Sequence, residues 1–500
     1  MTARRTLQRD LADEAATNRL GDDIAAMLKP GDLLALVGDL GMGKSTLARA
    51  IIRGLAGDQA LEVPSPTFTL VQAYETRIPV KHVDLYRLAS ADEVEELGIF
   101  DAPGETAVLV EWPERAWEAL PGERVVVRLS EHGAGRRAEI EAEPDFMERL
   151  DRSLAIRAFL DMAGMGGAHR RFLVGDASTR AYEIVEASSG EPLILMNAPP
   201  RPDGPPIRDG KPYSRIAHLA ETVVPFVAIA QALCEEGFAA PQIPAADLEN
   251  GILLVENLGW EGVLDADGQP IAERYLAAAE LLAELHGRTW PAQIEVDDAI
   301  THTIPPYDHG AMAIETELLT DWYLPHATGK QPDAAQRDAF GAGWRRMFDI
   351  LDGTEKSLVL RDFHSPNIIW RRERTGHDRI GLIDFQDAMI GPSAYDVASL
   401  AMDARVTIPT QLERQIVAAY CEARREQGRG FDRDRFGAAY AIMAAQRNSK
   451  ILGIFVRLNV RDGKPGYLRH LPRIRDYVVR AFEHPVLEPL RDIYRQAGVL

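Results

Sequence analysis

The segment that most constrains the fold is GDLGMGKS, which occupies residues 38–45 and matches the pattern GxxxxGK[ST] in full. It follows the short, continuously apolar run 33–37 and precedes a stretch in which Leu47, Ile51 and Leu55 repeat at helical spacing. A buried strand, a glycine-rich turn and a helix in this order form a loop whose backbone N–H groups and helix N-terminus face a phosphate. The sequence therefore predicts an α/β P-loop domain.

Each residue type in this loop has a definite task in phosphate binding. The glycines let the backbone curl around the phosphates, the lysine reaches the β- and γ-phosphates, and the serine hydroxyl is a ligand for Mg²⁺. The expected nucleotide-binding residues of the loop are Gly38, Gly41, Gly43, Lys44, Ser45 and Thr46. Asp84, near the end of the expected buried strand 80–85, and Glu111, directly after the expected buried strand 107–110, are the expected catalytic carboxylates. Asp84 is also an expected Mg²⁺ ligand, beside Ser45.

A second phosphate-handling pattern lies in the C-terminal half. Residues 358–367, LVLRDFHSPN, contain Asp-x₄-Asn after an apolar run, and Asp384 ends the next apolar run. Phosphoryl transfer needs a carboxylate near the acceptor hydroxyl and oxygen ligands on Mg²⁺. Kinase-fold enzymes place an Asp and an Asn on one loop and an Asp on the next. Asp362 is therefore the expected catalytic base, and Asn367 and Asp384 are the expected Mg²⁺ ligands.

The two patterns lie in blocks of different organisation. Residues 1–146 alternate strand-like and helix-like segments and end in an expected hairpin of 125–129 with 138–142. Residues 147–500 open with a helix near 148–162, continue with short strands and become mostly helical from about residue 273. The strands expected there are 171–174, 181–185, 192–196 and 252–255. We therefore expect an α/β P-loop NTPase domain over 1–146 and an α+β two-lobed, protein-kinase-like domain over 147–500.

Composition limits the partners and the compartment. The formal charge of -20 argues against broad nonspecific binding to nucleic acid. The two cysteines, Cys234 and Cys421, form no CxxC pair, which is typical of a reducing compartment and offers no thiolate metal site. The N-terminal segment has no apolar signal region, and the longest apolar stretch, about 223–233, is too short to span a bilayer. The sequence predicts a cytoplasmic protein without membrane association and with little direct nucleic-acid binding.

Five segments of the N-terminal block occur in a familiar order: GDLGMGKSTLARA, VPSPTFTLVQAYE, HVDLYRL, EELGIFD and VLVEWPER. Over about residues 5–143 this block resembles the TsaE family, the ATPase subunit of the bacterial machinery that makes threonylcarbamoyladenosine in tRNA. The resemblance implies that 65–67 form a switch-like segment in which Thr67 senses the γ-phosphate. It places Trp112 in the functional site with Asp84 and Glu111. It also implies contact with the protein subunits of the threonylcarbamoyl transferase complex.

In the C-terminal block, the segments GDASTRAYEI, ILLVENLG, LRDFHSPNIIW, IDFQDAMIGPSAYDVASL and AAQRNSKILGIFVRL carry a second resemblance. Over about residues 150–500 the block resembles one branch of the aminoglycoside-phosphotransferase-like family, the anomeric kinases of cell-wall amino sugars (AmgK-like). This implies ATP-dependent phosphorylation of the anomeric hydroxyl of N-acetylmuramate or N-acetylglucosamine in peptidoglycan recycling. It further implies an adenine hinge from Glu256 to Leu258. The residues implied in covering the phosphates are Gly175, Ser178 and Arg180.

Two questions stay open at this level. Kinases usually carry a lysine on the third strand of the first lobe, whereas LILMNAPP offers Met196 and Asn197. Arg180 and Lys211 are the candidates for the missing charge, and a non-catalytic nucleotide-binding module is the alternative reading of the domain. Aminoglycoside, choline and homoserine are alternative acceptors. The basic residues that fit either a substrate carboxylate or a solvated surface are Arg461, Lys464, Arg469 and Arg473.

Overall fold

The computed structural model describes residues 4–88, 90, 93–101, 104–173, 180–187, 190–428, 430–496 and 498–500. They form two compact units. The first comprises Met1–Ala198 with Pro244–Asn257, and the second comprises Pro199–Ile243 with Leu258–Leu500. The P-loop domain and the strands that open the C-terminal block therefore share one unit. The domain boundary predicted near residue 146 falls inside that unit and stays a prediction.

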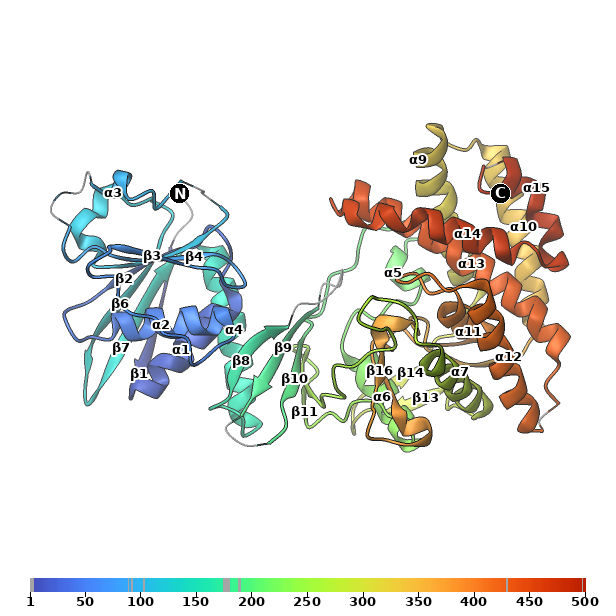
Figure 1. Ribbon diagram of the computed structural model, residues 1–500, viewed down its shortest axis with the longest axis horizontal. Helices are drawn as coiled ribbons and strands as arrows, with labels where there is room; N and C mark the ends of the chain where they lie inside the picture. The colour runs from blue at the N-terminus through green and yellow to red at the C-terminus, as the bar shows by residue number, and fades with distance from the viewer. Residues whose placement is uncertain are drawn as a thin grey trace. The chain divides into compact units, whose positions relative to one another are not determined.

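A seven-stranded sheet of order β1-β7-β6-β2-β5-β4-β3 forms the centre of the P-loop domain (Figure 1). The strands β6, β2, β5 and β4 are parallel, whereas β1 and β7 at one edge and β3 at the other are antiparallel to their neighbours. Their bounds are β1 Arg5–Leu11, β2 Leu33–Val37, β3 Val71–Tyr74, β4 Val80–Asp84, β5 Ala107–Glu111, β6 Val125–His132 and β7 Gly135–Ala142. The apolar runs of the sequence are the parallel strands, because both faces of such a sheet are buried.

Two differences from the sequence expectation have simple causes. The predicted hairpin exists, but its strands extend further and leave a two-residue turn at 133–134, where Gly133 adopts a φ of 59°. The edge strands β1 and β3 were not predicted, because most of their residues are exposed or half-buried and show no apolar pattern.

Helices cover one face of this sheet. The helices α1 (Glu14–Met27) and α2 (Lys44–Ala56) lie side by side, and the start of α4 (Pro144–Met162) joins them. Their apolar residues form one core with Leu34 and Leu36 of β2, whereas Leu33 belongs to a second core on the opposite face. The α3 turn (Glu93–Glu96) and the residues after β5 line that second core. The helix predicted after the P-loop, with Leu47, Ile51 and Leu55 on one face, is confirmed as α2, and its C-cap Gly57 adopts the left-handed conformation.

A five-stranded antiparallel sheet of order β11-β12-β10-β9-β8 follows in the same unit. Its strands are β8 His169–Leu173, β9 Ala181–Glu186, β10 Leu193–Asn197, β11 Ala245–Asp247 and β12 Ile252–Val255. The four predicted strands correspond to β8, β9, β10 and β12, apart from residue 174, which lies outside the described residues. One face of this sheet, including Val185, Leu195 and Leu254, packs against the second half of α4.

Helices dominate the second unit. They are α5 Tyr213–Ile216, α6 Val224–Glu235, α7 Ala272–Gly287, α8 His309–Leu318, α9 Leu324–Thr328, α10 Ala334–Asp352, α11 Ala394–Ala401, α12 Thr410–Glu426, α13 Arg433–Val460, α14 Leu471–Ala481 and α15 Glu488–Gln496. Short strand pairs connect them: β13 Gln293–Glu295 with β14 Thr301–Thr303, β15 Lys356–Val359 with β18 Met389–Pro392, and β16 Ile368–Trp370 with β17 Ile380–Leu382. The helix α13 is buried on all sides over residues 441–453 and contacts α8, α11 and α14.

Candidate active sites

The P-loop connects β2 to α2 with a backbone that requires glycine. Gly38 has a φ of 150°, and a Cβ there would lie 2.6 Å from the carbonyl oxygen of Leu129. Gly43 caps α2 with a φ of 98°, and a Cβ there would approach the Arg136 guanidinium to 3.2 Å. The loop residues, together with Thr67, Asp84, Glu111 and Trp112, line a cavity of about 370 Å³. The sequence-predicted residues of this site therefore lie together.

Lys44 is buried at the base of the cavity. Its Nζ donates hydrogen bonds to the carbonyl oxygens of Gly38 and Asp39 at 2.5 and 2.9 Å and lies 3.7 Å from the centre of the Trp112 ring. Burial lowers the pKa of Lys44, although nearby carboxylates, Glu111 first among them, act in the opposite direction. The ammonium is thus held in the loop by neutral carbonyl oxygens, which do not cancel its charge and which a phosphate would replace.

Two carboxylates face the loop. The Ser45 hydroxyl donates to Glu111 Oε2 at 2.6 Å, and the buried His82 Nε2 lies 2.8 Å from Glu111 Oε1. Asp84 Oδ2 accepts hydrogen bonds from the Ser65 and Thr67 hydroxyls at 2.7 and 3.0 Å. Hydroxyl and carboxylate oxygens are the ligands that Mg²⁺ prefers. The donor set of Ser45, Asp84 and Glu111 therefore fits this ion, and Thr67 lines the same cavity.

Sequence reasoning missed two residues of this site. His82 lies two residues before Asp84 on β4 and orients Glu111 across the parallel β4–β5 pair. Arg136 on β7 donates to the carbonyl oxygen of Gly41 at 3.1 Å and lines the cavity. Arg136 was hidden because the position of β7 near the P-loop follows only from the sheet order, and His82 because its contact with Glu111 follows only from the pairing of β4 with β5.

The second site lies in the second unit, on the loop after β15 and on the residues after β17. Asn367 Nδ2 donates to the carbonyl oxygen of Asp362 at 2.8 Å and to Asp384 Oδ2 at 3.2 Å. Gln386 Nε2 donates to Asp384 Oδ1 at 3.0 Å. Asp362, Asn367 and Asp384 are thus brought together. The amide and carboxylate oxygens fit Mg²⁺, and the Asp362 side chain lines a neighbouring cavity of about 200 Å³.

Buried carboxylates hold the loop that carries Asp362. Asp396 accepts from the backbone N–H groups of Leu360 and Arg361 at 2.7 and 2.9 Å. Asp403 accepts from the N–H of Ser365 at 2.7 Å and from the hydroxyl of Tyr275 at 3.0 Å. Both carboxylates are fully buried, so each satisfies backbone donors that would otherwise have no partner.

The cavity beside Asp362 is rich in cations. Its charged lining consists of the carboxylates Glu315 and Asp362 and the cations Arg361, Arg405, Arg447, Lys450 and Arg457. Glu315 is saturated, because Arg361, Lys450 Nζ at 3.1 Å and Gln446 Nε2 at 3.0 Å all donate to it. Burial would raise the pKa of Glu315, but the charges of Lys450 and Arg361 outweigh it and hold this pKa at about 2.

Arg447 and Arg457 differ from the other cations of this cavity. Arg447 is 3% exposed, and its Nη1 donates only to the carbonyl oxygen of Met402, at 3.3 Å. The Arg457 guanidinium lies 5.1 Å from the Tyr213 ring, and burial lowers its pKa. Within the described part of the chain, no carboxylate lies within 4.0 Å of either guanidinium. The cavity therefore offers positive charge that the protein itself does not neutralise.

Other predicted residues have different outcomes. Gly175 and Ser178 lie outside the described residues. Arg180 directly precedes β9, and the chain passes from the first unit to the second between Glu256 and Leu258. Lys211 is exposed in a short bridge with Arg208. Asn197 accepts two hydrogen bonds from Arg152 of α4, at 3.0 and 2.6 Å, so a cation that sequence reasoning did not consider reaches the end of β10.

The four basic residues considered for a substrate carboxylate do not line this cavity. Arg461 pairs with Asp462 at 2.7 Å on the surface, and Arg473 donates to the carbonyl oxygen of Ala404 at 2.6 Å. Three of the five cavity cations lie earlier on α13, at 447, 450 and 457, with helical spacing. The signal was the polar run QRNSK in the middle of a long apolar helix, which breaks the usual burial pattern.

The fold and the two sites define a protein that combines a P-loop nucleotide-binding domain with a kinase-like phosphotransferase. Residues 11–139 match the family described as "Threonylcarbamoyl adenosine biosynthesis protein TsaE", and residues 169–435 match the "Phosphotransferase enzyme family". The chain belongs to both families, as its two resemblances predicted. No helix in the described part of the chain has the length and apolar character needed to cross a membrane.

Individual relatives agree with this assignment. An N-acetylmuramate/N-acetylglucosamine kinase of Caulobacter vibrioides is 34% identical over 352 residues, which is 68% of this chain and 95% of the relative. A tRNA threonylcarbamoyladenosine biosynthesis protein TsaE of Rickettsia bellii is 39% identical over 120 residues, covering 24% of this chain and 83% of the relative. The TsaE protein of Bacillus subtilis is 40% identical over 115 residues, covering 23% and 70%.

Proposed function

We propose that the chain is bifunctional: an ATP-dependent anomeric kinase of N-acetylmuramate and N-acetylglucosamine, fused to an ATPase that supports threonylcarbamoyladenosine formation in tRNA. The convergence of Asp362, Asn367 and Asp384 beside a cation-lined cavity is the observation that carries the kinase assignment. The name of the Caulobacter relative supplies the sugar class. ATP and Mg²⁺ are the cofactors of both domains, and we place the protein in the cytoplasm, where ATP is available.

The chain's own groups suit phosphoryl transfer. Asp362 would orient the anomeric hydroxyl and accept its proton, while Asn367 and Asp384 would hold Mg²⁺. The ion, when bound, neutralises charge on the triphosphate. The Arg361 backbone, fixed by Asp396, sets the direction of Asp362 before substrate arrives. The reaction then needs little rearrangement of the loop.

The charge of the cavity discriminates between the acceptors. N-acetylmuramate differs from N-acetylglucosamine by a lactyl group that ends in a carboxylate. Aminoglycosides and choline are cations, and a cavity in which five basic side chains oppose two carboxylates repels them. Homoserine carries both charges and would leave most of the basic lining unmatched. We infer that Arg447 binds the lactyl carboxylate of N-acetylmuramate, in a cavity that Arg457 also lines.

The two sugars provide an internal control for this inference. Arg447→Met removes the charge while keeping much of the side-chain length. We expect the KM for N-acetylmuramate to rise about 10-fold or more, because a hydrogen bond to a charged group contributes roughly 1.5–3 kcal/mol. The KM for N-acetylglucosamine should change by less than about 3-fold, since this sugar has no carboxylate. The matched control is Arg461→Met, which removes a surface arginine paired with Asp462. Equal losses with both sugars would refute carboxylate recognition by Arg447.

The ATPase role rests on the P-loop site and on the TsaE family. We propose that the P-loop domain binds the protein subunits of the threonylcarbamoyl transferase complex, and that those subunits hold the tRNA. The test is complementation of a bacterial strain that lacks its own TsaE-family protein, with tRNA threonylcarbamoyladenosine measured by mass spectrometry. The wild-type chain should restore the modification and Lys44→Ala should not. Failure of the wild-type chain, expressed at normal levels, would overturn the assignment.

A further inference from the structure

The connection between the P-loop domain and the kinase sheet is a rigid element. The helix α4 runs without interruption from Pro144 to Met162. Its first half contributes Phe146 and Leu150 to the core of the P-loop domain, and its second half contributes Ile156 and Leu160 to the core beneath the kinase sheet. A single helix thus belongs to two cores, and the two parts cannot move independently without exposing apolar surface.

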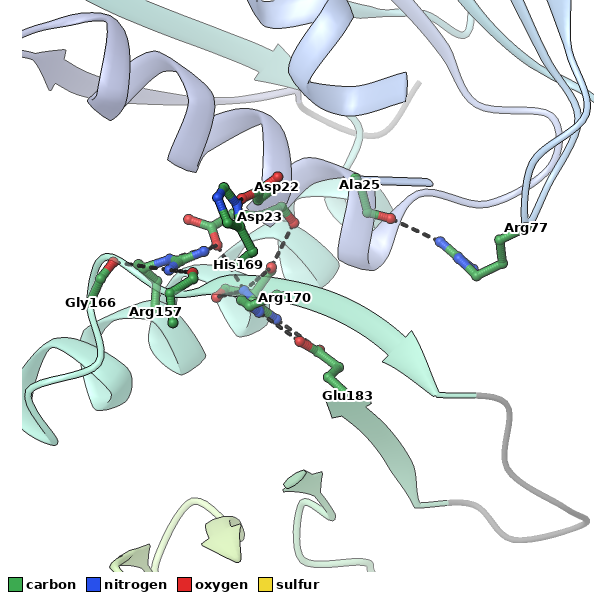
Figure 2. A network of polar contacts seen from close by, with 11 residues as sticks. Asp22, Asp23, Ala25, Arg77, Arg157, Gly166, His169, Arg170 and Glu183 are labelled. Carbon is green, nitrogen blue, oxygen red and sulfur yellow. Dashed lines mark hydrogen bonds and ion pairs between the residues drawn. The ribbon is translucent and has the colours of Figure 1, made fainter. Parts of the chain in front are cut away.

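A buried ion network joins the same two parts (Figure 2). Asp23 on α1 accepts from Arg157 on α4 and from Arg170 on β8, each at 2.9 Å. Arg170 continues to Glu183 on β9 through two parallel hydrogen bonds of 2.7 and 2.9 Å. All four side chains are less than 10% exposed. At the margin, Asp22 on α1 also contacts His169 on β8 at 2.9 Å.

This network crosses from one family to the other. Asp23 lies within the segment that matches the TsaE family, whereas Arg170 and Glu183 lie within the segment that matches the phosphotransferase family. Two buried carboxylates balance two buried guanidinium groups, so the loss of one member leaves an uncompensated charge in a dry environment. The two domains therefore depend on each other for the solvation of their buried charges.

The P-loop helix also reaches the kinase sheet. The helix α2 begins at Lys44 in the P-loop and ends at Gly57, where a Cβ would lie 2.6 Å from the Arg171 side chain of β8. Beside it, the Arg77 guanidinium lies 4.8 Å from the centre of the Phe172 ring and donates to the carbonyl oxygen of Ala25 at 2.8 Å. One end of α2 thus carries the phosphate-binding loop and the other touches a strand of the kinase.

We propose that the P-loop domain and the kinase sheet β8–β12 form one energetic unit, and that nucleotide binding at the P-loop is transmitted through α2 to β8 and β9. Binding at one end of a packed unit biases every element that shares its folding equilibrium. The proposal rests on nucleotide binding at the P-loop, but it does not depend on which sugar the kinase uses. It gives a reason for the fusion of the two domains, since the nucleotide state of the P-loop domain would then regulate the kinase.

Hydrogen exchange of the full chain at low denaturant concentration, read by mass spectrometry, tests the shared unit. Asp23→Asn should accelerate the slowest amides of β2 and β5 and those of β9 and β10 by a similar factor, at least about 10-fold. The matched control is Asp10→Asn, which removes an exposed carboxylate paired with Arg137 at the far edge of the P-loop sheet. It should leave both sets within about 2-fold. The proposal would be overturned if Asp23→Asn accelerates amide exchange in β2 and β5 but leaves amide exchange in β9 and β10 unchanged.

A second arm tests transmission and remains decisive if Asp23→Asn does not fold. Exchange is compared with and without ATP–Mg²⁺ in the wild-type chain and in Lys44→Ala, so that nucleotide bound by the kinase contributes equally to both. ATP should slow amide exchange in α2 only in the wild-type chain. It should also slow amide exchange in β8 and β9 more in the wild-type chain than in Lys44→Ala. Transmission would be refuted if ATP slows amide exchange in α2 of the wild-type chain but changes exchange in β8 and β9 equally in both proteins. If α2 does not slow, nucleotide binding at the P-loop is itself refuted, and transmission with it.

Discussion

Three residues of the two sites adopt the left-handed backbone conformation that side chains rarely take. Arg361 has a φ of 70°, Asp384 a φ of 61° and Trp112 a φ of 56°. Each lies directly after a strand or beside a predicted catalytic group, and such strain persists only where the surroundings enforce it. Asp396 binds the backbone N–H of Arg361, and Asn367 and Gln386 bind the carboxylate of Asp384. Three of the six non-glycine residues with positive φ in the described part of the chain therefore lie where phosphate chemistry is expected.

Glu111 provides the sharpest prediction in the P-loop site. Because it accepts from Ser45 and is oriented by His82, we expect it to act on the Mg²⁺–water side of the nucleotide. Glu111→Gln should lower ATP hydrolysis by about 10²-fold or more while ATP affinity changes by less than about 5-fold. Lys44→Ala, in contrast, should abolish binding at this site. The measurement is ATP binding and turnover in a chain whose kinase is inactivated by Asp384→Ala. Normal hydrolysis by Glu111→Gln would contradict the role.

The residues that could be predicted and those that could not differ in a physical way. The residues that could be predicted are recognisable from their spacing in short sequence motifs. They are Lys44, Asp84, Glu111, Asp362, Asn367 and Asp384. Other site residues have roles that depend on which strand or helix packs beside which, and the spacing of residues along the sequence does not contain that information. They are His82, Arg136, Asp403 and Arg447. Their roles became visible only through hydrogen bonds across elements.

At the scale of elements, α13 departs most from a simple core helix. Its buried middle contains Gln446, Arg447, Asn448, Ser449 and Lys450, whereas a helix buried on all sides is normally apolar. The partners come from α8, through Glu315, and from α11, through Tyr395. Polar groups in such a position specify how the helices pack, and here they also form the cation-rich wall of the cavity.

The charge at Glu315 should be essential for the stability of this arrangement. Glu315→Gln leaves Arg361 and Lys450 buried without their shared counter-charge, which we expect to cost about 3–5 kcal/mol in the free energy of unfolding. The matched control is Asp321→Asn. It breaks an exposed pair with Arg337 and should cost at most about 1 kcal/mol. Urea unfolding followed by circular dichroism provides the comparison. Equal losses in the two variants would show that the buried cluster contributes no special stability.

Sequence patterns predicted some of these elements and not others. The strands 33–37 and 252–255 have the predicted bounds, because a short apolar run between turn residues has one solution in a buried sheet. The edge strands β1 and β3 were missed, because most of their residues are exposed or half-buried and show no apolar pattern. The helix near 148–162 was predicted, but its membership in two cores was not, because its apolar positions look the same whichever sheet they face.

For the whole molecule, two histidines contribute to the response to mild acid. Burial, followed by the charges of Arg473, Arg469 and Arg405, lowers the pKa of His470 to about 4. Its Nδ1 lies 2.7 Å from Arg473 Nη2. This nitrogen can accept a hydrogen bond from the guanidinium only when the ring is neutral. Burial also lowers the pKa of His364. In the unfolded chain these rings titrate near the usual value of about 6.5.

Stability should therefore fall as the pH is lowered. Between about 6.5 and 4 the unfolded chain binds a proton at residue 470 that the folded chain does not, so His470 stabilises the fold above that window and loses its contribution within it. The lowered pKa of His364 acts in the same direction. We predict a lower urea midpoint at pH 5 than at pH 7.5, and a smaller difference in His470→Asn, which has no titrating ring. Identical pH dependence in the two proteins would contradict the assigned titration.

The central claim is the kinase reaction, and a product analysis tests it most directly. The full chain is incubated with ATP and Mg²⁺ and, separately, with N-acetylmuramate, N-acetylglucosamine, an aminoglycoside, choline and homoserine, and the products are examined by mass spectrometry and phosphorus NMR. We predict phosphorylation of the two amino sugars alone, on the anomeric oxygen, with loss of at least about 10²-fold in rate for Asp362→Asn. Phosphate on any other oxygen, turnover of a cationic acceptor in place of the sugars, or full activity of Asp362→Asn would contradict the account.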